Sequence, residues 1–209
     1  MEAQKSGTRT LLLLVITLNV YLILWQVLAA SFALPVYFYG RLIELLAVFL
    51  FVALALCTPM RFEEMGILVS RRTLWRSLAM GGAVGACFVA ALVILRLCGG
   101  HALSFSWHIV GDISRITYFA VAPFQEVLAK SVMLYSFELV LDKRHPYWAN
   151  ILSALTFAAF HVAYGVEMML AAGALSLVTG LLFLKERAVW GCAVAHFCCG
   201  FFPLCFGIS

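Results

Sequence analysis

Seven apolar segments joined by short polar connections make up most of the chain. Of its 209 residues, 65% are hydrophobic and only 11% are charged, a balance that is not typical of soluble domains. A helix needs about 20 mainly apolar residues to cross a bilayer. We therefore predict an all-α fold, a polytopic transmembrane helix bundle of about seven spans. The segments are 11–34, 42–56, 78–97, 116–140, 147–166, 168–184 and 189–206.

Basic side chains are distributed unevenly between the connections. With a cytoplasmic N-terminus, ten Lys and Arg residues lie in the inner connections, against Arg41 and Arg115 outside. Because such an excess marks cytoplasmic loops, we predict an N-in, C-out protein of the bacterial inner membrane. Residues 1–209 are expected to form one bundle in the lipid bilayer, and the net charge of +4 does not indicate a nucleic-acid partner. The ten inner residues are Lys5, Arg9, Arg61, Arg71, Arg72, Arg76, Lys143, Arg144, Lys185 and Arg187.

Three connections have features of their own. Pro35 and Gly40 predict a turn between the first two segments, and residues 62–75 predict a short amphipathic piece at the membrane surface. His101 and His108 fall in an outer loop, where we expect solvated side chains. The third segment begins with small residues, which allow helix backbones to approach closely. These are Ala79, Gly81, Gly82 and Gly85.

The stretch 122–130 places Gln125, Glu126 and Lys130 inside an apolar segment. A charge at the bilayer centre costs about 2.5–3.5 kcal/mol on insertion scales, so it usually has a function. Glu126 and Lys130 are four residues apart and can pair on one helix face. Pro123 removes a backbone donor and predicts a kink or break, which is tolerated in a membrane where it lines a cavity.

Two histidines lie within other apolar segments, His161 in the fifth and His196 in the last. Either one alone is explained by a bond to a carbonyl group on a neighbouring helix. Together with Glu126, they indicate a shared cavity. There, the carboxylate is predicted to act as a general base on water, while a histidine orients the water or stabilises an oxyanion.

Two other kinds of site fit some of these residues. Cys192, His196 and Cys199 share a helix face and form a partial zinc set, although no C-x-x-C or H-E-x-x-H motif accompanies them. We otherwise expect no cofactor. A proton or ion path would use the same Glu, Lys and His, and it predicts internal inverted repeats, of which the sequence has no convincing example.

The order of the motifs resembles the CAAX protease and bacteriocin-processing enzyme family, over about residues 64–202. These are glutamic-type intramembrane endopeptidases related to the type II CAAX prenyl endopeptidase. The resemblance implies that the first Glu of an E-E-x-x-x-R motif and two histidines activate water, with the second Glu and the Arg in support. The corresponding positions here are Gln125, Glu126, Lys130, Phe157, His161, His196 and Gly200.

Three of these positions depart from the family pattern. Gln125 replaces the first Glu and cannot take a proton. Lys130 replaces the Arg and keeps the charge without the bidentate fork. Gly200 replaces the Asn of the last motif, so an oxyanion donor is lost.

Two interpretations follow. In the first, Glu126 and His161 activate water and His196 supports the oxyanion, in an endopeptidase that cleaves a membrane-embedded, lipid-modified or C-terminal sorting peptide. Because adjacent helical residues point about 100° apart, Glu126 then needs a rotation or unwinding near Pro123. In the second, the chain is a degenerate member that binds such a peptide without cleaving it. The sequence predicts no oligomeric state.

Overall fold

The computed structural model describes residues 2–32, 36–57, 61–100, 113–141 and 143–206, and within these ranges it contains helices, turns and no strand. The predicted all-α class is confirmed. The helices, in chain order, are α1 (Glu2–Ser31), α2 (Val36–Cys57), α3 (Arg71–Cys98), α4 (Ile113–Glu126), the π-helix η1 (Val127–Leu134), α5 (Tyr135–Val140), α6 (Pro146–Ala159), the 3₁₀ helix η2 (Val162–Tyr164), α7 (Val166–Glu186) and α8 (Val189–Cys205).

Three helical stretches within the described residues are long and apolar enough to cross a membrane. They are Gly7–Ser31, Arg71–Cys98 and Val166–Glu186. The last helix, α8, is a shorter apolar helix. The chain is therefore an integral membrane protein, while its seven spans and their orientation stay predictions.

Two boundaries differ from those expected. Gly40 lies within α2 rather than in a turn, because this helix already begins at Val36. Residues 61–70 form turns and bends, so the predicted amphipathic piece is not a helix before Arg71. The backbone of this piece forms a turn instead, in which the Met65 amide donates to the Arg61 carbonyl at 3.0 Å.

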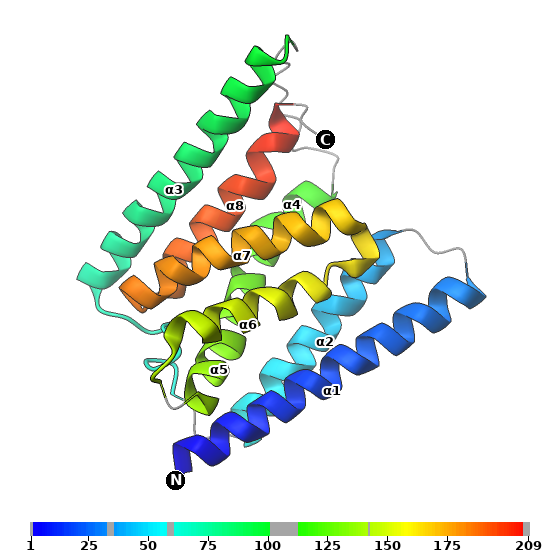
Figure 1. Ribbon diagram of the computed structural model, residues 1–209, viewed down its shortest axis with the longest axis vertical. Coiled ribbons are helices and arrows are strands. Elements are labelled where there is room, and N and C mark those ends of the chain that lie inside the picture. Colours follow the sequence, from blue (N-terminus) through cyan, green and yellow to red (C-terminus); the bar gives the residue numbers. More distant parts are fainter. Residues whose placement is uncertain (1, 33–35, 58–60, 101–112, 142, 207–209) are drawn as a thin grey trace.

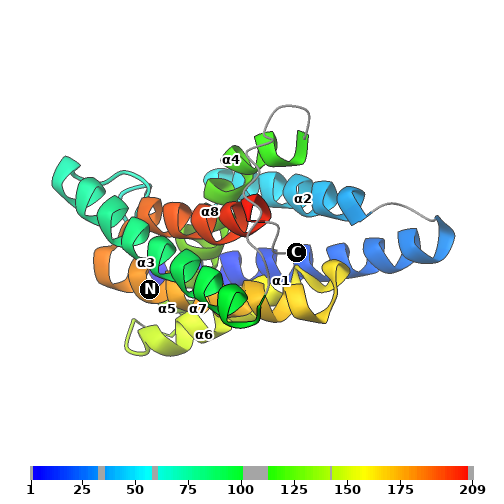
Figure 2. The same ribbon diagram turned by 90° about the horizontal axis from the view of Figure 1, so that it is seen from above.

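The central segment of the bundle is the continuous run α4–η1–α5 (Figure 1). At one end it contacts α8, and at the other it contacts α1. On one side of it α3 and α8 run side by side, and on the other lie α1 and α2 (Figures 1 and 2). Side chains from both sides can therefore reach α4.

Glycines allow α3 and α8 to approach closely. A Cβ atom at Gly81 would overlap the Gly191 carbonyl oxygen, and one at Gly85 would overlap the Cys198 side chain. The Gly191 amide donates to Ser77 Oγ at 2.8 Å, which links the two helices. The predicted role of small residues in the third segment is thus confirmed for Gly81 and Gly85.

Gly81→Ala is expected to destabilise the protein by about 1–3 kcal/mol, because the added methyl group meets the backbone of Gly191 and not a flexible side chain. The measurement is the apparent melting temperature in detergent. Gly82→Ala is the matched control on the same helix, since a Cβ there meets nothing within 4 Å. Equal melting temperatures for the two variants would contradict this account of the contact.

One end of the bundle gathers ion pairs between distant parts of the chain. Because a bidentate arginine–carboxylate pair fixes geometry as well as charge, these bonds hold the start of α3, the end of α5 and the end of α7 together. The bonds are Arg76 to Glu186, Arg187 to Glu138 at 2.6 and 2.8 Å, and Tyr135 to Glu64 at 2.7 Å. These are ends that the charge distribution predicts to be cytoplasmic.

Candidate functional site

Glu126 and His196 form a buried pair between α4 and α8. His196 Nδ1 lies 2.8 Å from Glu126 Oε1, and Glu126 has no exposed surface. Because a carboxylate only accepts hydrogen bonds, Nδ1 carries the proton and donates it. In the neutral imidazole the lone pair is then on Nε2. The carboxylate therefore fixes both the tautomer and the orientation of the ring.

His161 is held in the same tautomer by the backbone. Helix α6 ends at Ala159, earlier than the predicted segment, and His161 lies in the connection before η2. The His161 amide donates to the Ala158 carbonyl in a tight turn, and its Nδ1 donates to the Phe157 carbonyl at 2.8 Å. Because the helix ends here, the Phe157 carbonyl accepts from the His161 side chain instead of from the His161 backbone amide. In the neutral ring, the lone pair of His161 is therefore again on Nε2.

Both imidazoles lie close to the ring of Phe157. The centre of its ring is 4.7 Å from that of His161 and 6.1 Å from that of His196. Both histidines, Phe157 and Gln125 line a cavity of about 890 Å³. This volume falls in the range typical of ligand sites, about 300–1,000 Å³. The predicted Phe157, His161 and His196 are therefore brought together around one space.

Glu126 lies behind His196 and is not among the side chains that line this cavity. The carboxylate faces the imidazole, whereas the preceding residue, Gln125, faces the cavity. Helix α4 contains Pro123 and continues into η1 without a break. The rotation that would turn Glu126 toward the cavity is not observed.

Lys130 is fully buried and bonds to α7. Its Nζ donates to the carbonyl oxygen and to Oγ of Ser176, both at 2.7 Å. The expected pairing with Glu126 is replaced by these bonds, since Lys130 lies on the π-helix η1 and not on a regular α-helix. Its charge still lies close enough to Glu126 for an electrostatic interaction. Lys130 therefore compensates a buried charge without contacting the cavity.

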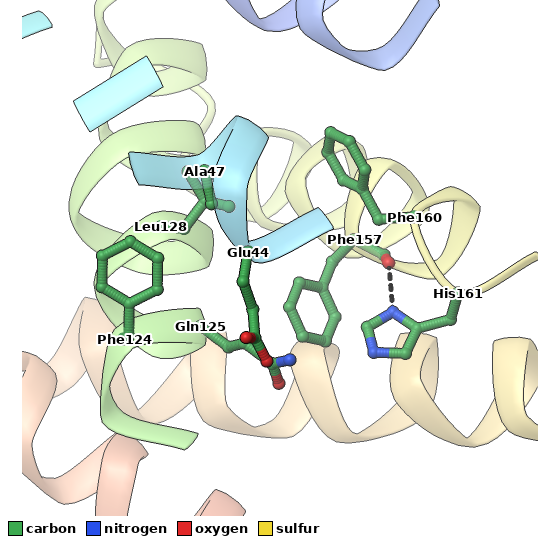
Figure 3. A pocket seen from close by; sticks show the side chains of 8 residues that line it. All are labelled: Glu44, Ala47, Phe124, Gln125, Leu128, Phe157, Phe160 and His161. Carbon is green, nitrogen blue, oxygen red and sulfur yellow. Dashed lines mark hydrogen bonds between the residues drawn. The ribbon is translucent and has the colours of Figure 1, made fainter. Parts of the chain in front are cut away.

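Glu44, which the sequence analysis did not select, also faces the cavity. It lies on α2 and lines both the large cavity and a small one of about 10 Å³, together with Gln125, Phe157 and His161. Figure 3 shows its carboxylate and the Gln125 amide extending toward the same end of the small cavity. A charge within an apolar helix was the available signal, as it was for Glu126.

Tyr118 is the second residue that the sequence analysis missed. A Cβ atom at Gly200 would overlap the Tyr118 hydroxyl group, so this hydroxyl occupies the space beside the backbone of α8. Tyr118 lines the cavity, and its ring meets that of His196 edge-on at 6.1 Å. Nothing in the sequence links Tyr118 to Gly200.

The partial zinc set has different contacts. The Cys192 thiol is buried and donates to the Thr179 carbonyl at 3.1 Å, while Cys199 lines the cavity. Within the described ranges, no group of three or more His, Cys, Asp or Glu side chains is placed to hold a metal ion. His101 and His108 lie outside these ranges.

Comparison with known proteins gives one match. Residues 113–202 match the family model described as "Type II CAAX prenyl endopeptidase Rce1-like". No curated protein and no solved structure matches the chain. The matched residues contain all the motif positions from Gln125 to Gly200, whereas α2 and Glu44 precede them. The resemblance to the CAAX protease and bacteriocin-processing enzyme family, drawn from the order of the motifs, is therefore confirmed over residues 113–202.

Proposed function

We propose that the chain is an intramembrane endopeptidase that hydrolyses a membrane-embedded or lipid-modified peptide, such as a C-terminal sorting segment. The observation that carries this proposal is the pair of imidazoles facing one cavity, one of them bonded to a buried carboxylate. A match to a CAAX protease family supports proteolysis as the reaction class. The substrate and the residue roles are part of the proposal.

The two histidines have different roles in the proposed reaction. His161 accepts a hydrogen bond from a water molecule through Nε2 and orients it toward the scissile carbonyl carbon. His196 acts as an imidazolium that donates from Nε2 to the developing oxyanion, and the Glu126 carboxylate stabilises this charge. The prediction that Glu126 itself activates water remains open to test, but its position favours action through His196.

Tyr118 supplies a second donor to the oxyanion. The family resemblance implies an Asn at the position of Gly200, and the Tyr118 hydroxyl fills the space beside that glycine. A phenolic hydroxyl donates one hydrogen bond, so it can perform the task of the missing amide. Gly200 is then required because any larger residue displaces Tyr118.

The cavity suits a peptide within the membrane. Two of the helices that line it, α3 and α7, are long and apolar enough to span a bilayer, and most of the side chains that line it are apolar. Apolar walls with a few polar groups are typical of sites that bind largely apolar ligands. A peptide carrying aliphatic side chains or a lipid chain matches this lining.

The chain reconstituted in liposomes is expected to cleave at least one of two quenched fluorescent probes. One is a peptide with a prenylated cysteine in a Cys-aliphatic-aliphatic-X tail, and the other is an unmodified transmembrane peptide. Tyr118→Phe is expected to lower kcat by about 10²–10³-fold, because it removes one oxyanion donor and keeps the ring. Phe119→Leu, at an exposed position on the same helix, is the matched control.

Other outcomes would favour other functions. Binding of a probe without cleavage would contradict the proposal and favour a degenerate family member. Cleavage that a chelator abolishes would favour a metal site, and ion-dependent uptake without proteolysis would favour transport. Full activity in Tyr118→Phe would remove Tyr118 from the site and leave the histidines in place.

A further inference from the structure

The polar residues that line the cavity include a carboxylate from outside the matched region. Glu44 lies on α2, eight residues after the first residue of that helix, or about 12 Å along its axis. Its side chain is 20% exposed, and Arg41 Nη2 bonds to its Oε1 at 2.7 Å. Ionisable groups within a membrane helix normally face a cavity and mark a functional path.

Glu44 and Gln125 meet at the same place from different helices. Both border the small cavity of about 10 Å³ together with His161, and the surface that the three side chains present to it is apolar. Both also line the large cavity, so the carboxylate is accessible to a substrate bound there. In Figure 3 the Glu44 carboxylate and the end of the Gln125 side chain lie together, and in this view the Phe157 ring lies between them and the His161 ring.

Gln125 cannot take a proton, since an amide is neutral and has no basic lone pair at ordinary pH. The position that faces the cavity on α4 therefore has no base of its own. Glu126, the next residue, is bonded to His196 and buried behind it. Glu44 is thus the carboxylate that the described structure places beside Gln125.

We propose that Glu44 is the catalytic carboxylate of this site and takes the place of Gln125 as the acceptor of the proton from water. The inference rests on the proposed endopeptidase function. A water molecule in the cavity gives one proton to the Glu44 carboxylate, and its oxygen forms a bond to the peptide carbonyl carbon. The tetrahedral intermediate then breaks its C–N bond, and the proton passes from Glu44 to the leaving amine. The products are a carboxylic acid and an amine.

Arg41 pairs with the Glu44 carboxylate and orients it. The guanidinium contacts Oε1, while Oε2 keeps lone pairs that can accept from water. Arg41 also lines the large cavity. An i,i+3 pair on one helix needs no other element to hold it. The pair therefore presents a carboxylate oxygen to the cavity.

The test moves the carboxylate from one helix to the other. Glu44→Gln is expected to lower kcat/KM for the cleaved probe by about 10²–10⁴-fold, the range for loss of a general base. The double variant Glu44→Gln/Gln125→Glu is expected to recover most of this loss, because it returns a carboxylate to the same space from α4. The pH profile of kcat/KM should lose its acid limb in Glu44→Gln and regain it in the double variant. Glu167→Gln, an exposed acid at the start of α7, is the matched control.

The possible failures are distinguishable. Wild-type activity in Glu44→Gln, with strong loss in His196→Ala, would overturn the role of Glu44 and leave the proposed function intact. Loss in Glu44→Gln that the double variant does not recover, with a lowered melting temperature, would make the Arg41–Glu44 pair structural and also overturn it. No cleavage of either probe by the wild-type chain, with cleavage created by Gln125→Glu, would overturn both proposals.

Discussion

His196→Ala is expected to lower kcat/KM for the cleaved probe by about 10²–10⁴-fold, the range for loss of a catalytic imidazole. The reason is that His196 is the imidazole that both lines the cavity and bonds to the buried Glu126 carboxylate. Its loss removes the cationic donor to the oxyanion and leaves Glu126 facing a void. The measurement is the cleavage rate in liposomes at matched protein content.

Glu126→Gln separates the direct role of this residue from the indirect one. If Glu126 acts through His196, the amide keeps the contact but no longer stabilises the imidazolium, and the loss is expected to be smaller, about 10–100-fold. A loss as large as that in His196→Ala would instead indicate that Glu126 acts on water itself. Full activity would remove it from the site. His145→Ala, at an exposed histidine before α6, is the control.

Lys130→Met is expected to destabilise the protein by about 3–5 kcal/mol, the cost of leaving a buried charge without the opposite charge that compensates it. Methionine keeps most of the volume, so the effect reports the charge. Glu126 is fully buried, and among the described side chains its Oε2 has no hydrogen-bond partner. Without Lys130, this carboxylate keeps its bond to His196 but loses a compensating positive charge. The apparent melting temperature in detergent is expected to fall by on the order of 10 °C.

The same measurement on a second variant shows whether charge is the cause. Glu126→Gln/Lys130→Met removes both charges and is expected to recover most of the lost stability, since neutral pairs are cheaper to bury. Lys185→Met, at an exposed lysine near the end of α7, is the matched control. A double variant as unstable as Lys130→Met would instead place the effect on the lost bonds to Ser176.

The helices could be predicted because membrane insertion leaves few alternatives. Backbone groups in hydrocarbon must bond within their own segment, so long apolar segments become helices. Their ends were harder to place. Helix α2 begins six residues before the predicted apolar segment, and α6 ends at Ala159 because the following turn is tight and leads to Gly165, whose φ is +93°. Such local geometry leaves little trace in hydropathy.

The candidate site was predictable where its residues follow the motif order, as His161 and His196 do. Glu44 and Tyr118 were missed because each lies on a different helix from the motif position that it approaches, Gln125 and Gly200 respectively. A motif describes one helix at a time. When a residue of the motif is replaced, the motif gives no information on which residue of a facing helix lies beside the replaced position.

The π-helix η1 affects how this chain is aligned with others. A π-helix closes its hydrogen bonds from residue i to i+5, one residue more than an α-helix. The four-residue spacing from Glu126 to Lys130 therefore matches the motif in sequence. The two side chains, however, do not point in the relative direction that this spacing gives on an α-helix. An alignment anchored on the acid and one anchored on the lysine can disagree by one residue about which side chain meets the substrate. Equivalent residues of relatives in this stretch are better assigned by superposing their cavities than by aligning their sequences.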